Sequence, residues 1–171
     1  KSRIISDAEK AIIAYHEGGH AVVQRILPKC DPVAKVTIIS RGMALGYTMA
    51  LPTEDRYLQS KTEFEDKIAG LLGGNVAERL IFGDTTTGAS NDIEKATDLA
   101  RRMVTEFGMS DKLGPLSFGK RDELVFLGRE IGEQRNYSDE VAKTIDEEVR
   151  AIIDKAYDRA TEVLTTHRDR L

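Results

Sequence analysis

The segment Ser6–Leu27 has the sequence SDAEKAIIAYHEGGHAVVQRIL and contains most of the chemical information in this chain. It opens with Ser6-Asp7-Ala8-Glu9, the spacing of a capping box, in which the Ser and Glu side chains satisfy each other's exposed amides. Apolar residues then recur at helical spacing as far as Leu27, and Pro28 prevents the helix from continuing. We therefore predict a helix over residues 7–27.

Within this predicted helix, His16-Glu17-Gly18-Gly19-His20 is an H-E-x-x-H sequence. Residues four apart lie on one helix face, so both imidazoles can reach one metal ion, while Glu17 is displaced and can address a water on that metal. Zinc suits neutral imidazole and lowers the pKa of water that it binds to about 7. A carboxylate beside that water can take its proton and pass it to a leaving amine. The spacing predicts one Zn²⁺ per chain, with His16 and His20 as ligands and Glu17 as catalytic base.

Two features favour a metal site over a chance match. The motif lies in an apolar stripe, where two unpaired imidazoles and a carboxylate would be unfavourable to bury. Gly18 and Gly19 each cost up to about 1 kcal/mol relative to Ala in a helix interior. We infer that another segment packs closely against the turn that these glycines form.

A zinc site of this kind needs a third protein ligand and leaves one position open. His167 stands at the end of the last predicted helix, where an exposed cationic residue is expected. Two carboxylates are better candidates: Asp92, after Thr87-Gly88-Ala89-Ser90-Asn91, and Glu78, after Gly73-Gly74-Asn75-Val76-Ala77. Spacing alone does not choose between Asp92 and Glu78.

The remaining sequence predicts a mainly helical domain over residues 1–171, with a small β-hairpin or sheet near the active site. A second capping box, Thr62 to Glu65, predicts a helix that ends near Gly83. Further apolar periodicities predict a helix from Ser90-Asn91 to Gly108 and a long helix along Val141–Leu164. The strand-like segments are Val36–Ile39 and Gly46–Leu51.

Composition excludes several other functions. The 171 residues carry a net charge of −4 with a pI near 5.5, so we expect no nucleic-acid partner. No apolar run is long enough to span a bilayer, so we expect this stretch to be soluble, with no membrane insertion of its own. Gly114–Lys120 nearly matches a phosphate-binding loop but is followed by Arg121 where Ser or Thr is needed. Deformylase-type sites carry a Cys ligand in a separate upstream motif, which this chain lacks, so Cys30 is not expected to bind the metal. As the single cysteine, Cys30 cannot form an internal disulfide.

Several stretches beyond the H-E-x-x-H motif make the chain resemble the peptidase domain of the FtsH family. They are Tyr15–Ala21, Asp31–Val33, Lys35–Ile39, Gly73-Gly74, Ala77-Glu78, Thr87–Asp92, Gly108–Ser110, Leu113–Pro115 and Phe126–Arg129. FtsH proteins are membrane-anchored, ATP-driven zinc proteases that form hexameric rings and degrade misfolded or regulatory proteins. The resemblance implies a zinc endopeptidase acting on unfolded polypeptides, in a larger protein that forms a homo-hexamer. It also implies membrane anchoring, with this domain facing the cytoplasm or an organelle interior.

By resemblance, the zinc ligands are His16, His20 and Asp92. Glu78 and Asn91 are then candidates for supporting those ligands from outside. The family segment that matches Gly46, Tyr47, Thr48 and Met49 is a strand beside the active site, so we expect it to hold an extended substrate by main-chain hydrogen bonds.

The chain departs from the family pattern at two positions. Gly18 stands where the family usually has Ala, and Arg79 where many members have a second Glu. A zinc hydrolase for another acyl or amide bond, and a helical oligomerisation or adaptor domain with an idle metal site, are the alternative functions. The presence of Glu17 argues against the last, because the catalytic base is commonly the first group that an inactive relative loses.

Overall fold

The computed structural model describes residues 4–39, 45–52, 57–119 and 137–171. In these residues the secondary structure is mainly helical with one small antiparallel sheet, as predicted. The helices and strands, in chain order, are α1 (Asp7–Ile26), β1 (Val33–Thr37), β2 (Tyr47–Ala50), α2 (Lys61–Phe82), α3 (Ser90–Thr105) and α4 (Asp139–Thr166).

Helix α1 begins with the predicted capping box. The backbone amide of Glu9 donates to Ser6 Oγ, and the backbone amide of Ser6 donates to Glu9 Oε2, each over 3.2 Å. The helix ends at Ile26, and the amide of Leu27 donates to the carbonyl of Val23. The boundaries predicted from the sequence are therefore correct to within one residue.

The N-cap of α2 is Ser60, two residues before Thr62, so the assignment of Thr62 as its cap is wrong. Ser60 has extended backbone angles and its hydroxyl accepts a hydrogen bond from the Glu63 amide over 3.2 Å. Ser60 and Glu63 have the same spacing as Thr62 and Glu65, and the extended backbone at Ser60 selects the earlier pair. The helix ends as predicted at Gly83, whose positive φ of 67° closes it.

The hairpin pairs β1 and β2 antiparallel, with Val36 opposite Thr48 and Val33 opposite Ala50. The strand predicted at Val36–Ile39 therefore begins three residues earlier and ends two residues earlier, and Ile39 is 71% exposed beyond its end. Local β-propensity does not detect this shift, because the register is set by pairing with β2. Strand β2 falls inside its predicted range.

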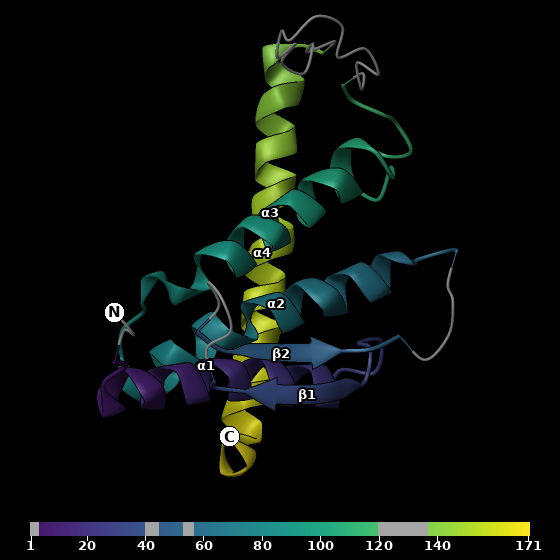
Figure 1. The fold of residues 1–171 in the computed structure, drawn as a ribbon. Coiled ribbons are helices and arrows are strands. Elements are labelled where there is room, and N and C mark those ends of the chain that lie inside the picture. The colour runs from purple at the N-terminus through teal and green to yellow at the C-terminus, as the bar shows by residue number, and fades with distance from the viewer. Residues whose placement is uncertain (1–3, 40–44, 53–56, 120–136) are drawn as a thin grey trace, which may run out of the picture.

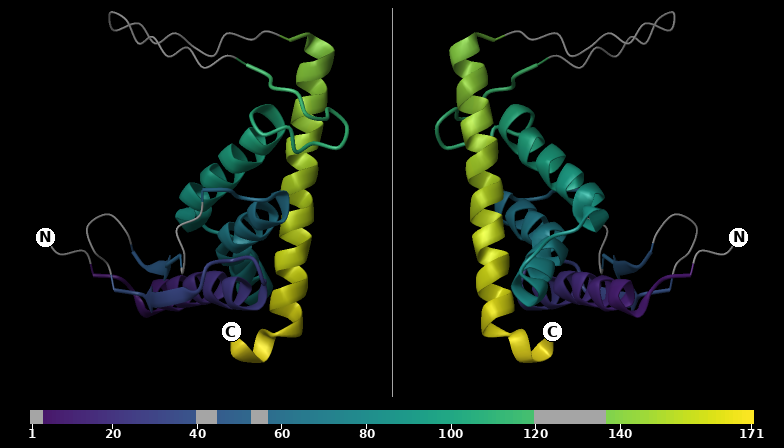
Figure 2. Two further views of the ribbon diagram at one scale, coloured as in Figure 1. Left: turned by 90° about the vertical axis from the view of Figure 1, so that its right-hand side faces the viewer. Right: turned by 90° about the vertical axis from the view of Figure 1, so that its left-hand side faces the viewer.

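Helix α2 is the centre of the fold and contacts α1, α3 and α4. Figure 2 shows α4 along one side of the molecule, with the other three helices packed on its inner side. Figure 1 shows the hairpin beside α1, with β2 nearer than β1 to α2. This arrangement leaves a cleft between α1, β2 and the start of α3.

Helix α3 follows a 3₁₀ turn, Thr87–Ala89, and ends at Thr105, three residues before the predicted end at Gly108. Gly108 has a positive φ of 61° in the segment that leaves the helix. Among the described residues, no helix has the length and apolar character needed to cross a membrane. Phe126–Arg129 and Lys120, which figured in the sequence comparison and in the near-match to a phosphate-binding loop, lie outside the described residues.

Candidate metal centre and active site

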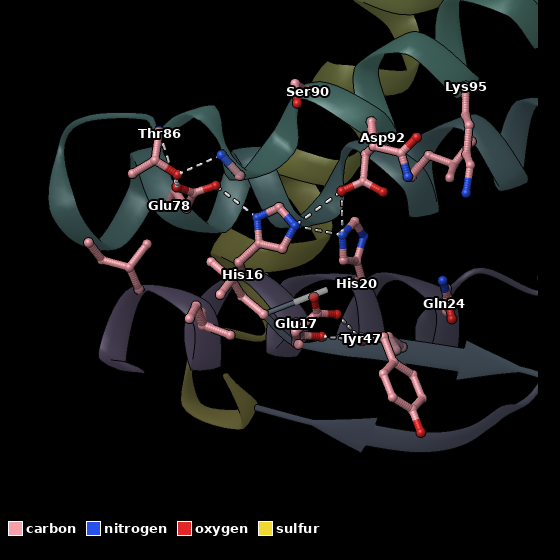
Figure 3. A pocket seen from close by; sticks show the side chains of 18 residues that line it. His16, Glu17, His20, Gln24, Tyr47, Glu78, Thr86, Ser90, Asp92 and Lys95 are labelled. Carbon is pink, nitrogen blue, oxygen red and sulfur yellow. Dashed lines mark hydrogen bonds and ion pairs between the residues drawn. The ribbon is translucent and has the colours of Figure 1, made fainter. Parts of the chain in front are cut away.

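The structure brings His16, His20 and Asp92 together at the bottom of the cleft (Figure 3). The two histidines lie one turn apart on α1 and are 7% and 6% exposed. Their Nε2 atoms are 3.0 Å apart, and Asp92 Oδ2, from the first turn of α3, is 3.1 Å from each. Three potential ligand atoms from two helices therefore form a nearly equilateral triangle.

The other ring nitrogen of each histidine has a partner that fixes its proton. His20 Nδ1 lies 2.7 Å from the carbonyl oxygen of Gly70, which can only accept, so this nitrogen carries the hydrogen. His16 Nδ1 donates in the same way to Glu78 Oε2 over 2.8 Å. In the neutral imidazoles both Nε2 atoms then present lone pairs to each other and to Asp92.

Three acceptor atoms at this separation repel one another unless a cation lies between them. Burial alone would raise the pKa of Asp92, but hydrogen bonds and positive charge from His16 and His20, in their protonated form, outweigh it and hold this pKa well below its usual range. Burial alone would lower the pKa of His16, but the carboxylates of Asp92 and Glu78 outweigh it and raise this pKa. The site therefore favours positive charge. Two imidazole nitrogens and one carboxylate oxygen are a donor set that fits zinc with a fourth position open.

Glu78 is itself held in place. It is 1% exposed, and its Oε1 accepts from Thr86 Oγ1 over 2.5 Å and from the Thr86 amide over 3.2 Å. Sequence reasoning named Glu78 as a support for a ligand but missed Thr86 and the Gly70 carbonyl. Nothing in the sequence marks either, because both contacts depend on how α2 and the turn before α3 pack around His16 and His20.

Glu17 is buried beside the three ligand atoms but does not join them. Its Oε2 accepts from Thr48 Oγ1 of β2 over 2.7 Å, and the same hydroxyl lies 3.0 Å from the Glu17 carbonyl. Gly46 brings the hairpin close, since a Cβ there would lie 3.3 Å from Glu17 Cγ. The sequence predicted Thr48 in a substrate strand and missed its contact with Glu17.

The predicted close packing around the two glycines of the motif is correct for only one of them. A Cβ on Gly19 would lie 2.3 Å from the carbonyl oxygen of Gly73, so only glycine fits where α1 crosses α2. A Cβ on Gly18 would lie 3.4 Å from Leu171 Cδ1, which is an ordinary contact, so the expectation for Gly18 is wrong. Gly74 makes a further close approach, since its Cβ would lie 2.5 Å from His16 Nε2 and 2.6 Å from His20 Nε2.

The cleft above the three ligand atoms has a volume of about 820 Å³. Gly46, Tyr47 and Thr48 of the predicted substrate strand line it. Met49 is 39% exposed and is not among the lining residues. Asn91 lines the cleft as an exposed residue, and among the described residues no hydrogen bond joins it to His16, His20 or Asp92.

The remaining candidates lie elsewhere. His167 is the C-cap of α4 and is not one of the three grouped residues. Arg79 is exposed and its guanidinium lies 5.8 Å from the centre of the Tyr157 ring on α4. Position 79 therefore faces α4, so the departure there changes a contact between helices and not the ligand cluster.

Paired histidines on one helix, a carboxylate between them and an adjacent glutamate are the arrangement found in zinc metallopeptidases. A family model described as peptidase family M41 matches residues 3–171. The chain is 62% identical over 171 residues to the ATP-dependent zinc metalloprotease FtsH 1 of Sphaerobacter thermophilus and 57% identical over 172 aligned residues to the FtsH of Bacillus subtilis. All of the chain is covered in both matches, but only 26% and 27% of those relatives, so the chain spans about a quarter of their length.

The chain belongs to peptidase family M41, and the family predicted from its motifs is confirmed. The names of both relatives describe FtsH-type zinc metalloproteases.

Proposed function

We propose that this domain is a zinc-dependent endopeptidase in which His16, His20 and Asp92 hold the metal and Glu17 is the catalytic base. The observation that carries the proposal is the triangle of three acceptor atoms, 3.0–3.1 Å apart, with no hydrogen available between them in the neutral imidazoles. Zinc bound there would polarise the scissile carbonyl and make water a better nucleophile near neutral pH.

The residues of the chain would divide the remaining work. Glu17 would take a proton from the attacking water as its oxygen forms a bond to the carbonyl carbon. When the C–N bond breaks, Glu17 would return that proton to the leaving amine, so the carboxylate is regenerated. The Thr48 hydroxyl, 2.7 Å from Glu17 Oε2, would fix the orientation of the carboxylate during both transfers.

Support for the ligands would come from outside the triangle. Glu78 and the Gly70 carbonyl hold the Nδ1 hydrogens of His16 and His20, and Thr86 holds Glu78. Such partners fix the ring orientation and raise the basicity of a ligating imidazole. Asn91 has no comparable contact, and we propose no role for it in positioning a ligand.

The substrate would be an extended, unfolded polypeptide. Gly46, Tyr47 and Thr48 line the cleft along β2. In the part of the chain that the structure describes, the edge of β2 away from β1 pairs with no other strand, so a substrate backbone could bind there. Backbone recognition of this kind accepts many sequences. A peptide bond inside a folded helix or central strand cannot reach the site, so a folded substrate must first be opened.

For the whole protein we propose an ATP-driven unfoldase that delivers chains to this domain. The support is the name "ATP-dependent zinc metalloprotease", carried by relatives of which the chain matches about a quarter. By the same family resemblance, the full-length protein would be a membrane-anchored homo-hexamer, with this domain in the cytoplasm or an organelle interior.

The test is hydrolysis of an unstructured, labelled polypeptide by the zinc-loaded chain, with and without a strong chelator. We expect slow cleavage that stops with the chelator, returns with stoichiometric zinc and does not depend on ATP. A tightly folded protein should survive, because a domain stable by about 5–15 kcal/mol is rarely unfolded. Hydrolysis that persists in the chelator, or that is confined to small esters and amides, would contradict the proposal.

A further inference from the structure

A second cavity, of about 370 Å³, continues the cleft away from the metal centre. The two cavities share Gln24 of α1 and Leu71 of α2 as lining residues, so they are neighbours along one groove. Gln24 stands one turn beyond His20 on α1, on the same side as the ligands (Figure 3). The groove therefore extends from the ligand cluster past Gln24.

Strand β2 forms the other side of this groove. Thr48 contacts Glu17 in the first cavity, and Ala50 lines the second. Residues two apart on a strand point to the same face and are separated by roughly 6.5–7 Å. A substrate bound as an extended chain along β2 has the same spacing. If one substrate side chain lies beside Thr48, the side chain two residues further along the substrate lies beside Ala50.

The lining of the second cavity indicates which side chain it accepts. Its apolar surface comes from Phe64, Leu71, Ala50 and Pro52, and from Cys30, whose thiol is uncharged because burial raises its pKa to about 12. The lining charges balance: they are Lys29, Lys67, Asp31 and Glu63. A volume of this size suits one large side chain, and the balanced charge favours a neutral one.

Gln24, at the junction, has unused hydrogen-bonding capacity. Its Oε1 is buried and has no hydrogen-bond partner among the described residues. Buried polar atoms in folded proteins are nearly always paired, so this side chain would gain a partner by turning its amide toward a backbone bound in the groove. A peptide backbone bound along β2 brings such partners past Gln24.

We propose that the second cavity is a specificity subsite that binds a large apolar side chain of the substrate. That side chain belongs to a residue two or three positions from the cleaved bond, always on the same side of the bond. This inference rests on the proposed peptidase function. The peptidase would thus combine backbone recognition, which is permissive, with one selective pocket. Cleavage would then occur at fixed distances from apolar residues in an unfolded chain.

The experiment measures kcat/KM of the zinc-loaded chain for unstructured peptides that differ at one position at a time, with Leu or Phe against Ala or Gly. We expect a preference for the large apolar residue of about tenfold or more, at one position two or three residues from the cut. Ala50→Phe fills the cavity and should abolish that preference while preferences at other positions stay. Met49→Phe is the matched control, because it adds the same group to the opposite face of β2.

Lys67→Glu provides a second variant in case Ala50→Phe does not fold. Lys67 is exposed at the rim of the cavity, and the substitution should raise kcat/KM for peptides with Lys or Arg at the same position only. A profile that stays unchanged in both variants, while hydrolysis remains zinc-dependent, would overturn the subsite but not the peptidase. Absence of chelator-sensitive hydrolysis in the unmodified chain would instead overturn the proposed function itself.

Discussion

The two walls of the cleft are built differently. On the helical wall, where α1 crosses α2 at Gly19, Gly73 and Gly74, backbone lies against backbone and against the two histidine rings. The hairpin wall, formed by β1 and β2, contacts α1 through Gly46 and Thr48, and its other side is open enough that Met49 is 39% exposed.

This difference separates two tasks. On the helical wall there is no room for a methyl group, so the positions of the His16 and His20 rings follow from the helix crossing itself. On the hairpin wall the orientation of Glu17 depends on one threonine hydroxyl. We therefore expect changes on the helical wall to remove the metal, and changes on the hairpin wall to slow the reaction while the metal stays bound.

The largest effect should come from Gly74→Ala. The new Cβ would occupy space 2.5 Å from His16 Nε2 and 2.6 Å from His20 Nε2, so the three ligand atoms could no longer meet. We expect zinc content to fall from near one per chain to near zero, and hydrolysis with it, while the circular dichroism spectrum stays helical. Gly18→Ala is the matched control and should keep its zinc. A fully zinc-loaded, active Gly74→Ala chain would contradict this prediction, because it would show that the helical wall can shift to accommodate a methyl group.

The next effect separates the two carboxylates near the histidines. Asp92→Ala removes a proposed ligand and should weaken zinc binding severely. Glu78→Ala removes only the partner of His16 Nδ1 and should weaken zinc binding by roughly 10–100-fold. Competition with a chelator of known affinity measures both. If the Glu78→Ala chain lost its zinc and the Asp92→Ala chain kept it, the third ligand would be misassigned.

A smaller effect is expected on the hairpin wall. Thr48→Val deletes the hydrogen bond to Glu17 and keeps the shape, so kcat/KM should fall by roughly tenfold to a hundredfold, from about 1.5–3 kcal/mol for a bond to a charged group. Thr48→Ser restores the hydroxyl and should recover most of that loss. Zinc content should be the same in all three chains, and loss of zinc in Thr48→Val would contradict the separation of the two walls.

The smallest effects concern stability. Beyond its effect on the metal, Gly19→Ala pushes a methyl group against the Gly73 carbonyl and should destabilise the metal-free fold by about 1–3 kcal/mol. Gly18→Ala has room beside Leu171 and should stabilise α1 by up to about 1 kcal/mol. Thermal unfolding of the two variants should therefore shift in opposite directions. Equal shifts would mean that the two positions are packed alike.

Local sequence signals predicted the helices and placed His16 and His20 on one face, because capping and helical periodicity involve only near neighbours. They did not choose Asp92, since it follows His20 by 72 positions and its approach depends on how α3 packs against α2. Family resemblance named Asp92, and the structure brings it to the two histidines. Gly18 and Gly19 illustrate the same limit, because neighbouring identical residues meet different surroundings.

Two of the contacts that sequence reasoning missed join segments that are distant in the chain. Thr48 and Glu17 are 31 positions apart, and His20 and the Gly70 carbonyl are 50 apart. The cap of α2 was misplaced for a different reason. Two capping-box spacings overlap there, and only the extended backbone at Ser60 distinguishes them.

Glu17→Gln, assayed for zinc and for peptide hydrolysis on the same preparation, tests the central claim most directly. The substitution leaves His16, His20 and Asp92 intact and removes only the group proposed to move protons. We predict that zinc stays near one per chain while hydrolysis of an unstructured peptide falls by orders of magnitude. Loss of zinc together with activity, or activity that persists with Gln at position 17, would contradict the account.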